Sequence, residues 1–157
     1  MTKTNVMRLL EQADIPFRTA EYEYDESDLS GNHAADVIGM PREQVFKTLV
    51  TRAGKGGIYV FCIPVCDELD LKKAAKACGE KSIEMLHVKE LLNVTGYIRG
   101  GCSPIGMKKR FPTYFHSTAV DFETIYVSAG VRGLQLEISP VALIDFVGGV
   151  IADVASF

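Results

Sequence analysis

The chain has 157 residues, of which 47% are hydrophobic and 24% are charged, and this balance is typical of a soluble globular domain with one apolar core. Its longest apolar tract, residues 145–157, is interrupted by two glycines and an aspartate, so the sequence predicts neither a membrane span nor a secretory signal, and we expect a cytoplasmic protein. The formal net charge of −3 argues against a uniformly basic nucleic-acid-binding protein.

The cysteines and histidines predict neither a disulfide framework nor a metal site. Cysteines of a cytoplasmic chain are expected to be free thiols, and here they are Cys62, Cys66, Cys78 and Cys102. The three histidines are isolated in the sequence, whereas zinc sites need clustered ligands at set spacing. We therefore expect no metal and no cofactor.

The first quarter of the chain predicts a helix, an edge strand and a second, short helix. Residues 2–16 place apolar side chains at helical spacing and end at a proline, and residues 17–24 alternate in the manner of an edge strand. An acidic loop, residues 25–32, leads into a short helix over residues 33–39, with Asn32 as its expected cap.

The middle of the chain predicts a hairpin followed by two helices. Residues 45–52 and 57–65 are rich in β-branched and aromatic side chains and are separated by a glycine-rich loop, as in a β-hairpin. Residues 68–79 read as a helix capped by Asp70, and residues 87–96 as another helix that ends at a glycine.

The last third predicts an irregular loop over residues 97–115, with regular structure only at its ends, and then a second hairpin over residues 123–139. A helix over residues 139–148 and a strand over residues 150–154 complete the chain. Strands and helices mix without a regular βαβ repeat. We therefore expect one α+β domain, residues 1–157, with a mixed and curved sheet.

Lys47 lies at the centre of the apolar run 44–50, where both faces of a strand would carry apolar neighbours. One interpretation is that its long side chain reaches solvent, as most such lysines do. The other is that it lies in a cleft, where it stays charged only if a phosphate or a developing oxyanion faces it.

Two glycine-containing segments are further candidates for a site. The N–H groups of Gly100 and Gly101 could donate to an oxyanion, although a glycine-proline segment such as 99–106 is also a common tight turn. Cys102 lies in this segment, but no histidine is near it in the sequence, which favours an inert thiol. Ser128 precedes the bend of the second hairpin, where its hydroxyl could line a pocket or close the turn.

The charge is distributed unevenly along the chain. Residues 71–110 hold nine Lys or Arg against three Glu, whereas the flanking segments are acidic. This basic segment can be a binding surface for phosphates or merely the solvated face of a helix and a loop.

Four segments together resemble the YbaK/EbsC family of bacterial aminoacyl-tRNA deacylases, which is related to the editing domain of bacterial prolyl-tRNA synthetase. These segments are "VFKTLV", "LDLKKAAKACG", "TGYIRGGCSPIGMKKRFPTYF" and "IYVSAGVRGLQLEISP". The resemblance extends over nearly the whole chain. It implies a single α+β domain with a barrel-like sheet surrounded by helices.

The resemblance also implies a site. The strand lysine, Lys47, would be the central catalytic residue, with Gly100 and Gly101 beside the substrate ester. The substrate pocket would include Tyr22, Thr48, Pro104 and Ser128. The chain departs from the family twice: Leu29 or Ser30 stands where members carry a phenylalanine, and Gln135 stands where they carry an aspartate.

The implied activity is removal of cysteine mischarged on proline tRNA by attack of the substrate's own thiol, with correctly charged cysteine tRNA as a further candidate substrate. The alternatives are a deacylase for another small residue such as alanine, and a non-catalytic module that binds an amino acid or nucleotide. The tRNA acceptor end would be bound by basic residues, namely Lys72, Lys76, Lys108, Lys109 and Arg110. A further expected partner is prolyl-tRNA synthetase, which would supply tRNA selectivity; no membrane partner is expected.

Overall fold

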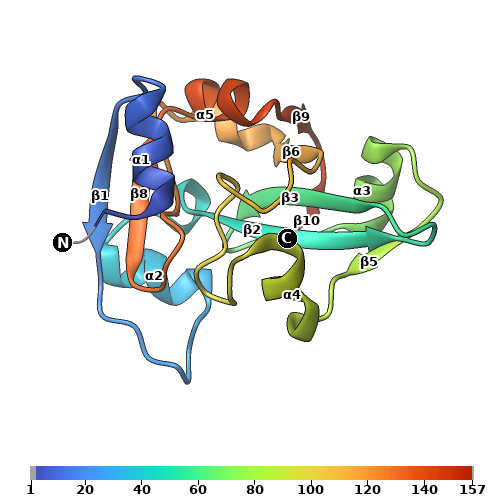
Figure 1. The fold of residues 1–157 in the computed structure, drawn as a ribbon, viewed down its shortest axis with the longest axis horizontal. Coiled ribbons are helices and arrows are strands. Elements are labelled where there is room, and N and C mark those ends of the chain that lie inside the picture. Colours follow the sequence, from blue (N-terminus) through green and yellow to red (C-terminus); the bar gives the residue numbers. More distant parts are fainter. Residues whose placement is uncertain (1–2, 157) are drawn as a thin grey trace.

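The computed structural model describes residues 3–156 (Figure 1). Thr2, the first residue of the predicted N-terminal helix, lies outside the described residues. The α-helices are α1 (Asn5–Gln12), α2 (Gly31–Ile38), α3 (Leu71–Cys78), α4 (Val88–Thr95) and α5 (Pro140–Val147), and the short 3-10 helices are η1 (Arg42–Gln44) and η2 (Ser117–Asp121). The strands are β1 (Phe17–Glu21), β2 (Phe46–Ala53), β3 (Ile58–Pro64), β4 (Glu68–Leu69), β5 (Ile83–Met85), β6 (Thr113–His116), β7 (Ile125–Ser128), β8 (Leu134–Ile138), β9 (Val150–Ala152) and β10 (Ala155–Ser156).

The strands form two main sheets and one two-stranded ribbon. The larger sheet has the order β5-β2-β3-β6-β9, in which β2 is antiparallel to β3 and β5, whereas β6 is parallel to β3 and β9. The smaller sheet, β1-β8-β7, is antiparallel, and β10 pairs with β4. The α+β class with a mixed sheet is therefore confirmed. Within residues 3–156 the sheets do not close into a barrel, because β5 and β9 remain edges of the larger sheet.

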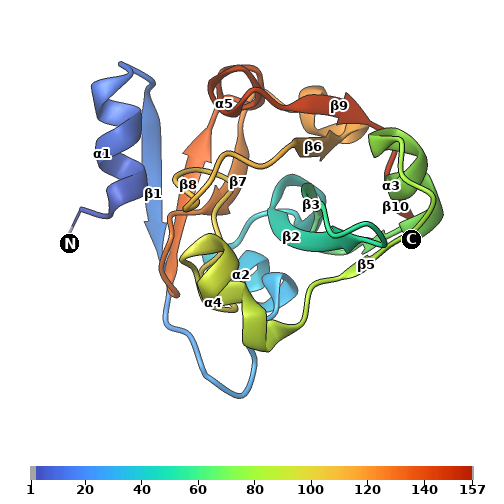
Figure 2. The same ribbon diagram turned by 45° about the vertical axis from the view of Figure 1, so that its right-hand side comes forward.

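The two faces of the five-stranded sheet are covered by different segments. Neighbouring residues of a strand point to opposite faces, so Val60 and Phe61 of β3 belong to separate cores. Phe61 packs with α3, whereas Val60 packs with α4 and with the loop that follows it. Figures 1 and 2 show that α3 lies apart from this loop.

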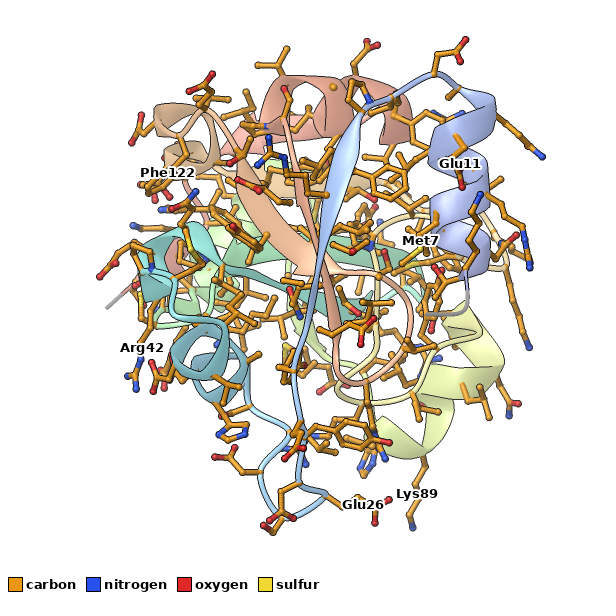
Figure 3. The ribbon with its side chains drawn as sticks, turned by 90° about the vertical axis from the view of Figure 1, so that its left-hand side faces the viewer. Met7, Glu11, Glu26, Arg42, Lys89 and Phe122 are labelled. Carbon is orange, nitrogen blue, oxygen red and sulfur yellow. The ribbon has the colours of Figure 1, made fainter. Side chains whose placement is uncertain are left out.

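The three-stranded sheet packs against α1 on one side. Met7 of α1 is 2% exposed and belongs to the largest core cluster, together with residues of β7 and β8. Figure 3 shows its side chain extending from α1 toward this sheet. The outer face of α1 is charged, so the helix is amphipathic as its sequence predicts.

The helix caps predicted from the sequence agree with the structure except at α2, and α1 is shorter than the predicted helix over residues 2–16. Asp70 caps α3 by accepting hydrogen bonds from the N–H groups of Lys72 (3.1 Å) and Lys73 (3.0 Å), as predicted. The predicted cap of α2, Asn32, is wrong. Ser30 caps this helix by accepting from the N–H of His33 at 3.2 Å, because the helix already begins at Gly31.

Candidate active site

A cavity of about 580 Å³ lies along one edge of β2. One end of β2 is bridged to β7 through Val45 and Tyr126, and the other end pairs with β5 from Thr51 onward. Between these two points the outer edge of β2 has no strand partner among the described residues. The cavity lies along this unpaired stretch of β2, and Ser128 of β7 is among its lining residues.

The cavity brings together eight of the residues that the sequence and its resemblance indicate. They come from four separate stretches of the chain, residues 22–30, 47–48, 100 and 128–135, and they are Tyr22, Leu29, Ser30, Lys47, Thr48, Gly100, Ser128 and Gln135. Two predicted residues, Gly101 and Pro104, do not line it. The fold therefore joins the strand lysine to the glycine loop and to the second hairpin.

The main chain of Thr48 faces the cavity. The C=O of Val45 accepts from the N–H of Val65 on β3, whereas the C=O of Val50 accepts from the N–H of Leu86 on the opposite side. Because main-chain groups of successive residues in an antiparallel strand alternate between the two sides, those of Thr48 share the side of Val50. The N–H and C=O of Thr48 are thus open to a guest. The resemblance implied Thr48 as a pocket residue without indicating which of its groups faces the substrate.

Lys47 is partly buried, and its Nζ donates a long hydrogen bond of 3.4 Å to the C=O of Val65. Burial lowers the pKa of its amine, while the charges of Glu68 and Asp67, and the Cys66 thiol, raise the pKa in opposition. The charged side chains that line the cavity are Lys47 and Arg99, and within residues 3–156 no carboxylate lines it. The electrostatics therefore favour an anionic or strongly polar guest. Arg99 was not singled out in the sequence.

Gly31 allows the start of α2 to approach β3 beside Lys47. A Cβ at this position would lie 2.3 Å from Cγ1 and 2.9 Å from Cβ of Val65, and 3.9 Å from Cβ of Lys47. Distances of this kind leave room only for a hydrogen atom. Gly31 therefore positions the residue whose carbonyl accepts from Lys47, a role that nothing in the sequence pattern indicated.

The two glycines of the loop have different environments. Gly100 lines the cavity with a φ of 87°, and its N–H has no hydrogen-bond partner among residues 3–156. The N–H of Gly101 instead donates to the C=O of Ile98 at 3.0 Å, and a Cβ there would lie 3.1 Å from the backbone of Val131. The expectation that both amides face an oxyanion is therefore corrected: Gly101 closes the turn, and Gly100 alone offers a free donor.

The remaining polar groups of the cavity are neutral. Burial raises the pKa of Cys102 to about 12, which keeps this thiol protonated and agrees with an inert role. Ser128 accepts a hydrogen bond from the N–H of Gly130 at 3.1 Å and lies opposite Gln135 in the pairing of β7 with β8. The Oε1 of Gln135 is buried and has no hydrogen-bond partner within the described part of the chain. A guest with a donor group would satisfy it.

The basic residues that the sequence proposed for tRNA binding form two groups. Lys72 and Lys76 lie on α3, which covers one face of the five-stranded sheet. Residues 108–110 follow the loop that packs on the opposite face, and Lys109 and Arg110 line a smaller, separate cavity. The basic segment is therefore not one continuous surface.

The described residues contain neither a candidate metal cluster nor a helix suited to cross a membrane. Among residues 3–156, no three His, Cys, Asp or Glu side chains are grouped in a way that could hold a metal ion. None of the helices in this part of the chain combines the length and the apolar character that crossing a membrane requires.

The fold is that of a known class of domain. Residues 30–146 match the family model of the aminoacyl-tRNA editing domain, and the chain belongs to this family. It is 49% identical over 154 residues to the "Putative Cys-tRNA(Pro)/Cys-tRNA(Cys) deacylase EbsC" of Enterococcus faecalis, covering 98% of this chain and 94% of that protein. The resemblance stated from the sequence is thereby confirmed.

More distant relatives share the domain or the fold. A 99-residue stretch is 26% identical to the proline–tRNA ligase of Thermosipho africanus, covering 63% of this chain but 18% of the ligase. The crystal structure of "a putative trans-editing enzyme for prolyl tRNA synthetase" has a TM-score of 0.84 at 23% identity and covers all of both chains. The structural match shows that the chain shares its fold with that protein.

Proposed function

We propose that this chain removes cysteine mischarged on proline tRNA, acting in trans as an aminoacyl-tRNA deacylase. The observation that carries the proposal is Lys47, a partly buried cation in a cavity that no carboxylate of residues 3–156 lines. Family membership and the 49% identical relative support ester cleavage on tRNA. The terminal phosphate and the ester oxygens of an aminoacyl-tRNA are the kind of guest that such a cation stabilises.

The proposed chemistry uses the nucleophile of the substrate itself. The cysteine sulfur attacks the ester carbonyl carbon, a C–S bond forms, and the C–O bond to the terminal ribose breaks. The thiol proton passes to the departing ribose oxygen, and the amino acid leaves as a cyclic thiolactone that water later opens. An intramolecular attack avoids the entropic cost of bringing in a separate nucleophile.

The protein would position the ester and stabilise the charge that develops on it. Lys47 would hold its ammonium group near the ester oxygens or the terminal phosphate, and the free N–H of Gly100 would donate to the oxyanion. The N–H and C=O of Thr48 would fix the aminoacyl group along the edge of β2. Since water does not attack the ester in this route, the first step is not a hydrolysis.

The identity of the amino acid is tested by a panel of tRNAs charged with cysteine, alanine, serine and proline. We expect kcat/KM for cysteine to exceed the other values by at least about a hundredfold, because only cysteine carries a thiol at this position. Equal turnover of alanine would show that water is the nucleophile. Binding of all four without turnover would identify a non-catalytic module. Gln135, in place of the aspartate that the family resemblance implies, favours this alternative.

Selection of proline tRNA would come from a partner, because a domain of this size contacts only the acceptor end. We propose prolyl-tRNA synthetase as this partner. Analytical sizing of the chain with the synthetase and tRNA should show a complex that contains all three components. Separate elution of the chain from a synthetase–tRNA complex, at micromolar concentrations and low salt, would contradict this partner.

A further inference from the structure

A second cavity, of about 220 Å³, lies between α1, the loop after α4 and the end of α5. It shares no lining residue with the first cavity. Its walls are apolar and include the partly exposed aromatic side chains Phe111 and Phe146. Its charged lining residues are Lys109 and Arg110, and within residues 3–156 no carboxylate lines it. Apolar walls with a cationic rim suit a nucleobase attached to a phosphate.

The walls of this cavity are held in place by hydrogen bonds that involve two helices, α4 and α5, and Tyr97, which follows α4. The N–H of Lys108 donates to the C=O of Thr95 at 3.0 Å, at the end of α4. The hydroxyl of Tyr97 donates to the C=O of Ile105, and the guanidinium of Arg110 donates to the C=O of Phe146 at 3.0 Å, near the end of α5. The second cavity is therefore preformed, which lowers the entropic cost of binding.

One loop contributes walls to both cavities. Gly100 and Cys102 line the first cavity, and two residues further along the chain Pro104 lines the second. Two residues span at most about 7 Å, so the cavities lie on either side of one short piece of chain. If the terminal aminoacyl-adenosine occupies the first cavity, the nucleotide before it must lie close to this loop.

We propose that the second cavity binds the nucleotide that precedes the terminal adenosine of the tRNA acceptor end. This inference rests on the proposed function, since it takes the first cavity as the site of the ester. The base would lie against the aromatic and aliphatic walls, and Lys109 and Arg110 would contact its phosphate. Pro104, which does not line the first cavity, would thereby contribute to tRNA binding instead.

The test uses RNA minihelices that copy the acceptor stem, with either a normal or an abasic nucleotide at the position before the terminal adenosine. Their binding is measured uncharged, by fluorescence anisotropy, and their deacylation is measured after charging with cysteine. We expect the abasic change to weaken binding and to lower kcat/KM by about tenfold, since stacking of one base on an aromatic side chain contributes roughly that much.

The variant Phe146→Ala tests whether the loss caused by the abasic change arises in the second cavity. If the base contacts Phe146, the abasic change should cost the variant much less than it costs the wild type, because a shared contact makes the two effects non-additive. Lys109→Gln, an exposed change that leaves the core intact, should weaken both RNAs to a similar degree, about threefold. Lys55→Gln, in the exposed turn between β2 and β3, is the matched control and should weaken neither.

The outcomes separate this inference from the proposed function. Deacylation that proceeds equally on normal and abasic RNA would overturn the second cavity as a nucleotide site and leave the deacylase intact. Base-dependent binding without deacylation would overturn the deacylase and leave the nucleotide site. If the abasic change costs Phe146→Ala as much as it costs the wild type, the base lies elsewhere. If the wild type neither binds nor deacylates the normal RNA, both proposals are overturned.

Discussion

Replacing Lys47 by alanine should lower kcat on cysteinyl-tRNA(Pro) by about 10²- to 10³-fold, the usual loss when one stabilising contact to a developing oxyanion is removed. Lys47 is one of the two cationic side chains that line the first cavity, and the other, Arg99, is exposed. No neighbouring side chain would replace its charge. Single-turnover deacylation with labelled cysteine measures the effect directly.

We expect the protein to remain folded without the Lys47 amine, and the melting temperature of a second variant tests this. Burial lowers the pKa of the Lys47 amine, so the folded state binds a proton there less readily than the unfolded chain, and the charged amine opposes folding below its folded-state pKa. The penalty fades as the pH rises from that pKa toward 10.5. Lys47→Met, which keeps an unbranched apolar side chain, should therefore melt no lower than the wild type at pH 7, with the smallest difference at high pH.

Both variants are compared with Lys55→Ala, in the exposed turn of the β2–β3 hairpin, which should keep full activity. Retention of half the wild-type rate by Lys47→Ala would remove Lys47 from the mechanism. A melting temperature that falls sharply in Lys47→Met would instead show that the amine stabilises the fold, and any loss of activity would then have a structural origin.

Replacing Gly31 by alanine should lower kcat/KM by about 10²-fold and destabilise the protein by about 1–3 kcal/mol. The new Cβ would overlap Cγ1 of Val65 at 2.3 Å, so Val65 must move, and its C=O is the hydrogen-bond acceptor of Lys47. Overpacking of this kind costs energy in that range, and a displacement of about 1 Å at a reacting site can lower the rate a hundredfold. Denaturant unfolding and deacylation rates measure the two effects.

A double variant tests the cause. Adding Val65→Ala removes the Cγ1 atom that the new methyl group would overlap, so the double variant should recover part of both the stability and the activity lost in Gly31→Ala. Gly57→Ala is the matched control, since its Cβ would meet Tyr59 only at an ordinary 3.4 Å. Purely additive losses in the double variant would show that Val65 is not the obstacle.

The sequence predicted most of the regular structure because most of it is local. Caps such as Asp70, and glycines after α3 and α4, mark helix ends through bonds between residues a few positions apart. The short strands β4, β5 and β10 were missed. They have two or three residues each, and their pairing depends on segments far away in the chain, such as β5 on β2.

The sequence pointed to Lys47 and to the amides of the glycine loop, whereas the main-chain groups of Thr48 were not predicted. Lys47 stood out as a charge in an apolar strand, and the resemblance supplied its neighbours. The difference between Gly100 and Gly101 depends on which N–H is already bonded, and two adjacent glycines look identical in a sequence. Gly31 is likewise required by one contact with Val65, which lies just after β3 and far from Gly31 in the sequence, so no local pattern marks it.

The open stretch of β2 bears on how such a pocket can change its preferred amino acid. Every aminoacyl ester carries the same carbonyl and amino groups, and the N–H and C=O of Thr48 would be available to them whatever side chain stands at that position. The groups that differ between substrates would meet the side-chain walls of the cavity, such as Leu29, Ser30 and Gln135. Evolution could therefore exchange the side chains that line the pocket while the main-chain contacts of Thr48 with the shared part of every substrate are kept.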